Sequence, residues 1–261
     1  MHRLLLINPN TSASISALLQ SHAQTAAGEQ SQVVTRTARF GAPYISYEAS
    51  YAVAAHATLD AWAAAVAPGQ ARFDSVLIGC FGDPGLLALR QVSQLPVTGL
   101  AEASFIAAAA QGRFAIVTGG ERWKPMLERL AHSLGFAEPL GGIHTVTATG
   151  AELAANPLAA QVLLARACNE AARRWGVQSV ILGGAGLAGM AAMIQPVVAV
   201  PVIDSVLIGV AHALRQAQQE TLQPPKVFDF AWSGVSQELA ATGQLRSGPG
   251  DLVVEGVPNA L

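Results

Sequence analysis

The chain contains the segment Ser75-Val-Leu-Ile-Gly-Cys80-Phe-Gly-Asp-Pro-Gly-Leu-Leu-Ala88, in which an apolar run, a tight turn and the start of a helix follow one another. Residues 76–78 predict a buried strand, and Asp83 and Pro84 are typical of an N-cap and a first helical residue. Cys80 would then face the amides that open the helix, a field that favours a thiolate. Ligands of open α/β sheets bind at this end of the strands.

The same strand and turn recur 104 residues later, where Ser179-Val-Ile-Leu-Gly-Gly184 has glycine at the position of Cys80. Two further strand-and-turn segments recur in the same order at nearly the same offset. We interpret this as an internal duplication that produces two α/β lobes related by an approximate two-fold. Their facing carboxyl ends would share a cleft, with Cys80 on one wall and Gly184 opposite. The further pairs are residues 3–10 with 113–120 and residues 95–99 with 200–204.

The composition is that of a well-buried α/β protein. Of the 261 residues, 51% are hydrophobic and 12% are charged, and the mean hydropathy is +0.38, which also suits the subunit interface of a homo-oligomer. A net charge of −2 provides no basic surface for nucleic acid. No apolar run reaches the roughly 18 residues of a membrane-spanning helix, and residues 4–7 are too short for a signal peptide. Two cysteines make no disulfide framework, so we expect a cytoplasmic protein with reduced thiols.

The rest of the chain alternates short apolar runs with helical segments, as expected of parallel sheets flanked by helices. We predict one lobe over residues 1–100, completed by about residues 205–261, and a second lobe over residues 101–204. The pattern breaks after Pro224, which predicts an irregular tail. Cys168 falls in mid-helix, where a buried free cysteine packs as a small hydrophobe. Predicted strands are residues 4–7, 32–37, 76–78, 96–99, 114–117, 143–147, 180–182 and 198–203. The first predicted helix follows a cap among residues 10–12 and runs to about residue 27, and the others are residues 53–66, 101–111, 122–134, 158–175 and 206–219.

Short polar side chains follow the first predicted strand, in Asn8-Pro-Asn-Thr-Ser12. The last three of these residues can each cap the next helix. The loop also offers polar groups beside free backbone amides, where an anionic or carbonyl-bearing ligand could bind. The residues alone leave capping and binding both open. A second loop, residues 40–51, carries Tyr44 and Tyr47; loops after strands often cover sites, but aromatic residues in loops more often pack.

A second glycine pattern resembles the fingerprint of dinucleotide-binding proteins. Gly184-Ala-Gly-Leu-Ala-Gly189 fits G-x-G-x-x-G after a strand, and Asp204 lies 20 residues past Gly184. The internal duplication explains this segment better, because Asp204 falls in a strand matched to residues 96–99 and the matching turn of the first lobe lacks the pattern. The six histidines are scattered, without H-x-H or H-E-x-x-H. We therefore expect neither a nicotinamide cofactor nor a metal site.

Four motifs, taken together, are recognisable: Ile7-Asn-Pro-Asn-Thr-Ser12, Cys80-Phe-Gly-Asp-Pro-Gly-Leu86, Pro96-Val-Thr-Gly-Leu-Ala-Glu-Ala-Ser104 and Pro201-Val-Ile-Asp-Ser205. They resemble the aspartate/glutamate/hydantoin racemase superfamily, and within it the hydantoin and allantoin racemase branch, over about residues 1–220. The resemblance implies a cofactor-independent, often oligomeric enzyme with two pseudo-symmetric α/β lobes. Its substrate would be a small carboxylate or a cyclic imide or ureide. One cysteine from each lobe would flank the acidic carbon, one thiolate removing the proton and the opposite thiol returning one to the other face.

The resemblance assigns roles to residues of both lobes. Cys80 matches the first cysteine, and the second would stand at position 184, where this chain has Gly184. No titratable residue follows in Ala185–Ala192. The turns that would hold the carbonyl or carboxylate oxygens of the substrate contain Asn8, Asn10, Thr11, Phe81, Thr118, Gly119, Ala185 and Gly186.

A single thiol has a mechanistic consequence, because a proton taken from one face of a carbon tends to return to that face. We predict a racemase or isomerase that acts through Cys80 at a carbon next to a carbonyl, with inversion dependent on a further group or water. A decarboxylase of the arylmalonate type, with Cys80 as proton donor, is an alternative, although Phe81-Gly82 lacks the hydroxyl-bearing pair of that enzyme. A cis–trans isomerase with Cys80 as nucleophile and a binding protein without turnover are further alternatives.

Overall fold

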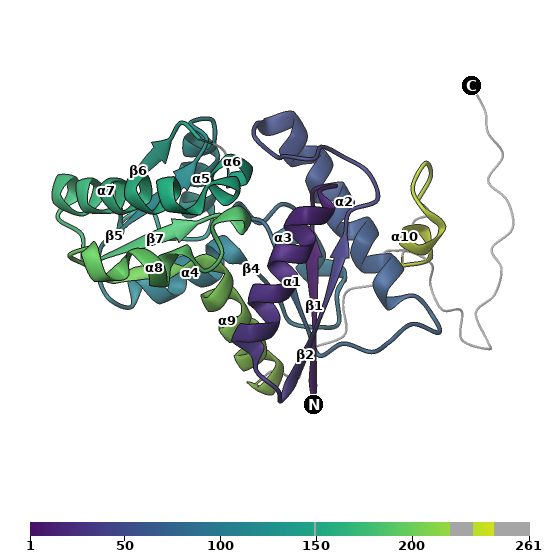
Figure 1. The fold of residues 1–261 in the computed structure, drawn as a ribbon. Helices are drawn as coiled ribbons and strands as arrows, with labels where there is room; N and C mark the ends of the chain where they lie inside the picture. Colours follow the sequence, from purple (N-terminus) through teal and green to yellow (C-terminus); the bar gives the residue numbers. More distant parts are fainter. Residues whose placement is uncertain (149, 220–231, 243–261) are drawn as a thin grey trace, which may run out of the picture.

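A computed structural model describes residues 1–148, 150–219 and 232–242. The chain forms two four-stranded parallel sheets, which lie in two lobes side by side (Figure 1). The predicted α/β fold with two lobes is therefore confirmed. The first sheet has the order β2 (Ser31–Thr37), β1 (His2–Asn8), β3 (Ser75–Ile78) and β4 (Val97–Gly99), and the second has the order β6 (Leu140–Val146), β5 (Phe114–Gly119), β7 (Ser179–Gly183) and β8 (Val202–Asp204).

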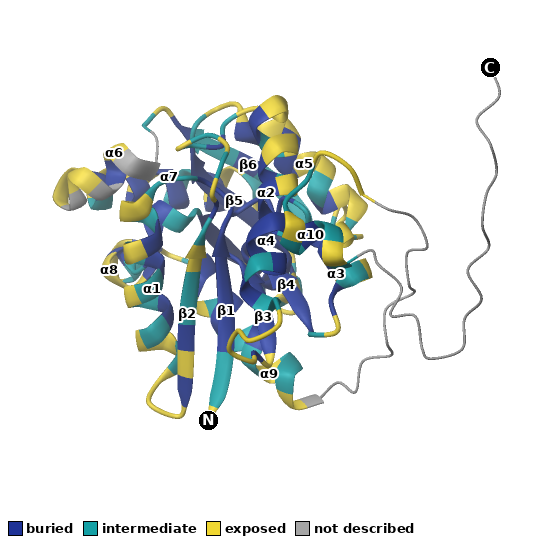
Figure 2. Cartoon of the chain, turned by 90° about the vertical axis from the view of Figure 1, so that its right-hand side faces the viewer, coloured by how far each residue is buried: buried dark blue, intermediate teal, exposed yellow. Residues whose placement is uncertain are grey.

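Helices cover both faces of each sheet, and the sequence reflects this. The residues of β3 and β7 are all buried, as expected of parallel strands packed on both faces, and Figure 2 shows most of the strand residues in dark blue. Among the described residues, no helix has the length and apolar character needed to cross a membrane. The helices are α1 (Ala13–Ala27), α2 (Glu48–Val66), α3 (Leu86–Val92), α4 (Leu100–Ala109), α5 (Trp123–Ser133), α6 (Gly150–Ala155), α7 (Pro157–Trp175), α8 (Met190–Ile194), α9 (Ser205–Gln219) and α10 (Gln237–Thr242), with 3₁₀ turns η1 (Ala185–Leu187) and η2 (Gln195–Val197).

The two sheets repeat the same topology and the same register. Ile7 of β1 pairs with Ile78 of β3, as Val117 of β5 pairs with Leu182 of β7. These four residues match one another at the offsets found in the sequence. The internal duplication predicted from the sequence therefore corresponds to two lobes of like construction.

Two helices join the lobes. α4 and α9 pack against each other, and α4 also contacts β7, whereas α9 contacts α1 and β3 of the first lobe. The chain thus leaves the second sheet at β8 and returns to the first lobe. This path supports the predicted completion of lobe 1 by the segment after residue 204; the lobe boundaries themselves stay a prediction.

The predicted start of α3 is wrong. The helix begins at Leu86, and its N-cap is Gly85 at φ 84°. Asp83 and Pro84 lie in the turn before it, and Asp83 is itself left-handed, at φ 52°. The sequence suggested a local cap, but the Asp83 carboxylate is used by a different helix, as described in the next section.

Other elements match their predictions with small shifts. Ser12 caps α1, accepting the N–H of Ile15 at 3.3 Å. The strand predicted over residues 198–203 is shorter and lies later in the chain, as β8 (Val202–Asp204). Cys168 is fully buried in α7, as predicted. In the described part of the C-terminal segment, α10 packs on α2; the rest of the predicted irregular tail lies outside the described residues.

Phe105 of α4 is fully buried where the lobes meet. Its ring lies 6.1 Å edge-on from that of Phe81 in the turn after β3, and 5.7 Å from that of Phe114 in β5, in a stacked geometry. The ring of Phe136 lies 5.8 Å from that of Phe105. One side chain therefore links the turn that carries Cys80 to the core of the second lobe.

We predict that Phe105→Ala lowers the free energy of unfolding by about 3–5 kcal/mol, the usual cost of emptying a fully buried aromatic site. Urea denaturation followed by circular dichroism measures it. Ile106→Ala is the matched control, because this neighbour in α4 is 39% exposed and its loss should cost less than about 1 kcal/mol. Equal losses for the two variants would contradict the assigned role of Phe105.

Candidate active site

A cavity of about 100 Å³ lies where the carboxyl ends of the two sheets face each other. The turns after β1, β3, β5 and β7 all contribute to its wall. Of the residues predicted for the site, those in the lining are Asn10, Cys80, Phe81, Thr118, Gly119, Gly184, Ala185 and Gly186. The lining residues that were not predicted are Ser12, Ile15, Pro43, Tyr44, Ile45, Gly79 and Trp123.

Cys80 is a free cysteine with 7% of its surface exposed. Its carbonyl accepts the N–H groups of Gly82 and Asp83, at 2.9 and 3.1 Å, and these bonds shape the turn. Burial raises the pKa of the Cys80 thiol, and the negative charge of Asp83 raises it further. The expectation of a thiolate is therefore wrong. The physical reason is that the Cys80 side chain is buried, and desolvation disfavours the charged form of a thiol.

Asp83 belongs to the turn between β3 and α3, and only 1% of its surface is exposed. Its carboxylate accepts the N–H groups of Ala101 and Glu102, at 2.9 and 2.8 Å, and so caps the start of α4. It occupies the space that a side chain at Gly99 would need. Burial raises the pKa of Asp83 to about 7, although the two backbone hydrogen bonds act in the opposite direction. Asp83 thereby ties the Cys80 turn to the helix that joins the lobes.

The loop after β1 is organised by Asn8, which is fully buried and does not line the cavity. Its side-chain amide donates to Asn10 Oδ1 at 3.0 Å, to the Ser12 carbonyl at 3.1 Å and to Ser16 Oγ at 2.9 Å. Asn10 Oδ1 also accepts the Ser12 N–H at 2.9 Å. Asn10 Nδ2 has no acceptor among the described residues, so it is available to a ligand oxygen. Asn8 therefore holds the Asn10 side chain in place, and Asn10 lines the cavity with its side-chain amide.

Thr11 is likewise outside the lining, and its N–H donates to the carbonyl of Ala42 at 3.1 Å. It therefore anchors the loop before α2 rather than contacting the cavity. Thr118 and Gly119 line the opposite wall at the end of β5. The N–H groups of Phe81, Ala185 and Gly186 have no acceptor within the described ranges. These backbone donors come from both walls and suit an oxygen that gains negative charge.

Gly184 stands opposite Cys80 in the duplicated turn, at φ 147° and ψ 136°. A β-carbon there would meet Leu187 at 3.5 Å, which is ordinary van der Waals contact. Space therefore permits a side chain, but this φ lies in a region that L residues rarely adopt. The backbone conformation at position 184 therefore favours glycine.

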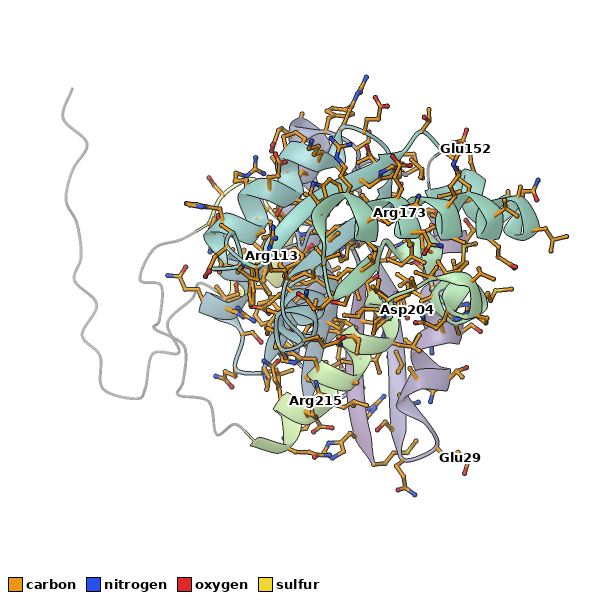
Figure 3. All side chains as sticks on the ribbon, turned by 90° about the vertical axis from the view of Figure 1, so that its left-hand side faces the viewer. Glu29, Arg113, Glu152, Arg173, Asp204 and Arg215 are labelled. Carbon is orange, nitrogen blue, oxygen red and sulfur yellow. The ribbon has the colours of Figure 1, made fainter. Side chains whose placement is uncertain are left out.

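Asp204, the acidic residue of the rejected dinucleotide fingerprint, is fully engaged within the protein. Its carboxylate accepts the Gly189 N–H at 2.7 Å and the N–H groups of Val206 and Leu207 at 2.9 and 3.1 Å. It therefore caps α9, and Figure 3 labels it near the start of that helix. These bonds occupy the carboxylate oxygens that a ribose would need.

Two aromatic residues of the cleft were missed from the sequence. Trp123 opens α5 and packs against Gly82, leaving no space for a side chain there. Tyr44 belongs to the loop between β2 and α2, which we expected to pack. Its position in the lining depends on the approach of the two lobes, for which the loop sequence has no signal.

Comparison with known proteins places this geometry among racemases. The family model described as Asp/Glu/Hydantoin racemase matches residues 4–213. A hydantoin racemase of Pseudomonas sp. (strain NS671) is 31% identical over 214 residues, which are 81% of this chain and 84% of that relative. The solved allantoin racemase from Klebsiella pneumoniae is 30% identical with a TM-score of 0.81, covering 92% of this chain and 99% of that one. The allantoin racemase from Pseudomonas fluorescens is 27% identical with a TM-score of 0.78, covering 83% and 91%.

The raised pKa of Cys80 predicts slow alkylation of its thiol. In a Cys168→Ala background, the rate of reaction with iodoacetamide should still be rising at about pH 9, because a free cysteine titrates near 8.5 and this thiol titrates above it. Mass spectrometry of the intact chain follows the reaction. A plateau of the rate below about pH 7 would show a stabilised thiolate and contradict this assignment.

The φ angle of Gly184 leads to a prediction about the stability of a variant with a side chain at this position. Gly184→Cys should fold with a loss of about 1–3 kcal/mol in the free energy of unfolding, because a β-carbon has room but the φ angle is unfavourable. Ala185→Cys, in the next residue, is the matched control and should cost less. A Gly184→Cys variant as stable as the unmodified chain would show that the φ angle imposes no strain.

Proposed function

The chain belongs to the Asp/Glu/hydantoin racemase family, and we propose that it is a cofactor-independent racemase of a hydantoin or allantoin type of ureide that uses Cys80 as acid/base. Two named relatives and two solved racemases of similar architecture support an enzyme of the racemase/isomerase class. The observation that carries the proposal is the cavity itself, in which one thiol and several unpaired hydrogen-bond donors lie together.

The chemistry follows from what the cavity offers. A carbon next to a carbonyl is weakly acidic, and removal of its proton places negative charge on the carbonyl oxygen. The Asn10 amide and the free N–H groups of Phe81 and Ala185 supply donors for that charge, as in other preorganised sites. Cys80 removes the proton as a thiolate and returns one as a thiol. Because burial keeps the resting thiol neutral, deprotonation of Cys80 precedes the proton transfer and the rate should rise with pH.

The lining favours an uncharged ring as substrate. None of the described lining residues is Asp, Glu, Lys, Arg or His. A free amino acid or a dicarboxylate would leave its charges without a partner in a buried site, which is costly. A cyclic ureide carries carbonyl and N–H groups that neutral donors and acceptors can match. The volume of about 100 Å³ also lies below the roughly 300–1,000 Å³ of drug-sized pockets, which fits a small ring.

One observation favours a second candidate function. A thiol held neutral by burial is suited to protonating the carbanion left when a malonate loses carbon dioxide. The absence of a cationic side chain from the described lining disfavours the dianionic substrate of such a decarboxylase. Release of carbon dioxide from phenylmalonate, dependent on Cys80, would select this reaction over racemisation.

Proton NMR of enantiopure 5-substituted hydantoins in D₂O tests the proposal. The signal of the α-proton should disappear with the unmodified enzyme, and Cys80→Ala should slow this exchange by about 10³-fold or more, the upper range for loss of a general base. Cys168→Ala is the control, because that thiol is buried in α7 away from the cavity.

Two results would contradict the proposed function. Exchange of the α-proton at an undiminished rate in Cys80→Ala would show that Cys80 is not the acid/base. An absence of exchange with every hydantoin and with allantoin would remove the substrate class, and the search would move to malonates and unsaturated diacids.

A further inference from the structure

Inversion at carbon needs a proton donor on the face opposite to Cys80, and position 184 carries no side chain to supply it. Among the described residues that line the cavity, only two side chains titrate: the thiol of Cys80 and the phenol of Tyr44. The other polar side chains in the lining are Asn10, Ser12, Thr118 and the indole of Trp123. The identity of the second acid is therefore restricted to Tyr44 or to water.

The hydroxyl of Tyr44 lies at the wall opposite Cys80. Its loop belongs to the first lobe, but a β-carbon at Gly120, just past β5, would lie 2.8 Å from the Tyr44 hydroxyl. Thr118 of β5 pairs with Gly183 of β7, so the ends of these strands, which lead to Gly120 and Gly184, are adjacent. The phenol thus reaches the sheet edge on which the missing side chain would have stood.

Contacts on both sides hold Tyr44 in this place. The Trp123 side chain lies beside its hydroxyl, because a β-carbon at Gly120 would meet both the hydroxyl, at 2.8 Å, and Trp123, at 3.6 Å. Its loop is anchored by the bond from the Thr11 N–H to the Ala42 carbonyl, and by Ile45, which is 3% exposed. An acid held by its own loop and by the opposite lobe is positioned before substrate arrives, which is what proton transfer requires.

The protonation state of Tyr44 suits an acid. Burial raises the pKa of Tyr44, and negative charge on Cys80 would raise it further, while the neighbouring Trp123 side chain acts in the opposite direction. Burial therefore favours the protonated phenol, which is the form that can donate a proton.

We propose that Tyr44 is the second catalytic acid/base and serves the face of the carbon opposite to Cys80. The inference rests on the proposed function. In one direction the Cys80 thiolate takes the α-proton and the electron pair passes to the carbonyl oxygen. The pair returns to carbon as the Tyr44 hydroxyl delivers its proton to the opposite face. A thiol and a phenolate remain, and transfer of one proton through solvent restores the starting pair; the opposite enantiomer uses the same steps in reverse.

Tyr44→Phe separates removal of the α-proton by Cys80 from delivery of a proton to the opposite face. An enantiopure hydantoin is incubated in D₂O, and chiral chromatography with mass spectrometry measures deuterium in each enantiomer. Formation of the opposite enantiomer should fall about 100-fold or more, as expected for loss of a general acid. Deuterium should still enter the starting enantiomer, because Cys80 can remove a proton and return a deuteron to the same face. A structural role for Tyr44 would lower both rates together.

Tyr47→Phe is the matched control, since this tyrosine lies in the same loop, is 49% exposed and does not line the cavity. Its rates should equal those of the unmodified enzyme, and thermal unfolding verifies that both variants fold. Undiminished inversion in Tyr44→Phe overturns the inference. Exchange with retention in the unmodified enzyme also overturns it, while leaving the function of Cys80 intact. An absence of all exchange overturns the proposed function and the inference together.

Discussion

Parallel strands place all their carboxyl ends at one edge of a sheet, and in this chain two such edges face each other. The cleft and its chemistry depend on that constraint. The turns after β1, β3, β5 and β7 can meet around one cavity only because both sheets have the same strand order and register. Phe105 and the packing of α4 on α9 hold the edges at this separation. Each copy of the duplicated lobe therefore supplies one wall of the cavity.

In each lobe a buried carboxylate caps the helix that follows the last strand, but the two carboxylates come from different positions in the lobes. In the second lobe a carboxylate on the last strand, Asp204, bonds the turn after β7 and caps α9. In the first lobe the matching strand position is Gly99, and the carboxylate of Asp83 fills the vacant space from the turn and caps α4. One carboxylate in each lobe thus joins the active-site turn to the next helix. The catalytic asymmetry between Cys80 and Gly184 is accompanied by this structural asymmetry.

Most of the fold could be predicted from local sequence, because the strands are buried apolar runs and the turns recur at a fixed offset, whereas the site residues were predicted from the resemblance of the turns to the racemase family. Eight predicted site residues line the cavity, whereas Asn8 and Thr11 support the loops around it. The failures concern relations between distant segments. The role of Asp83 depends on the amides of α4, eighteen residues away, and the place of Tyr44 depends on the opposite lobe. The thiolate expectation failed because the fold buries the Cys80 side chain, and burial disfavours the charged thiolate.

The central claim is that the cleft transfers protons on two faces of one carbon, from two different walls. The most direct measurement is the location of deuterium in the first few per cent of turnover of an enantiopure hydantoin by the unmodified enzyme in D₂O. With one acid on each wall, the newly formed enantiomer carries deuterium from the start while the remaining substrate stays largely protiated. Deuterium in the starting enantiomer before any inversion would contradict the account and leave a cleft that works from the Cys80 wall alone.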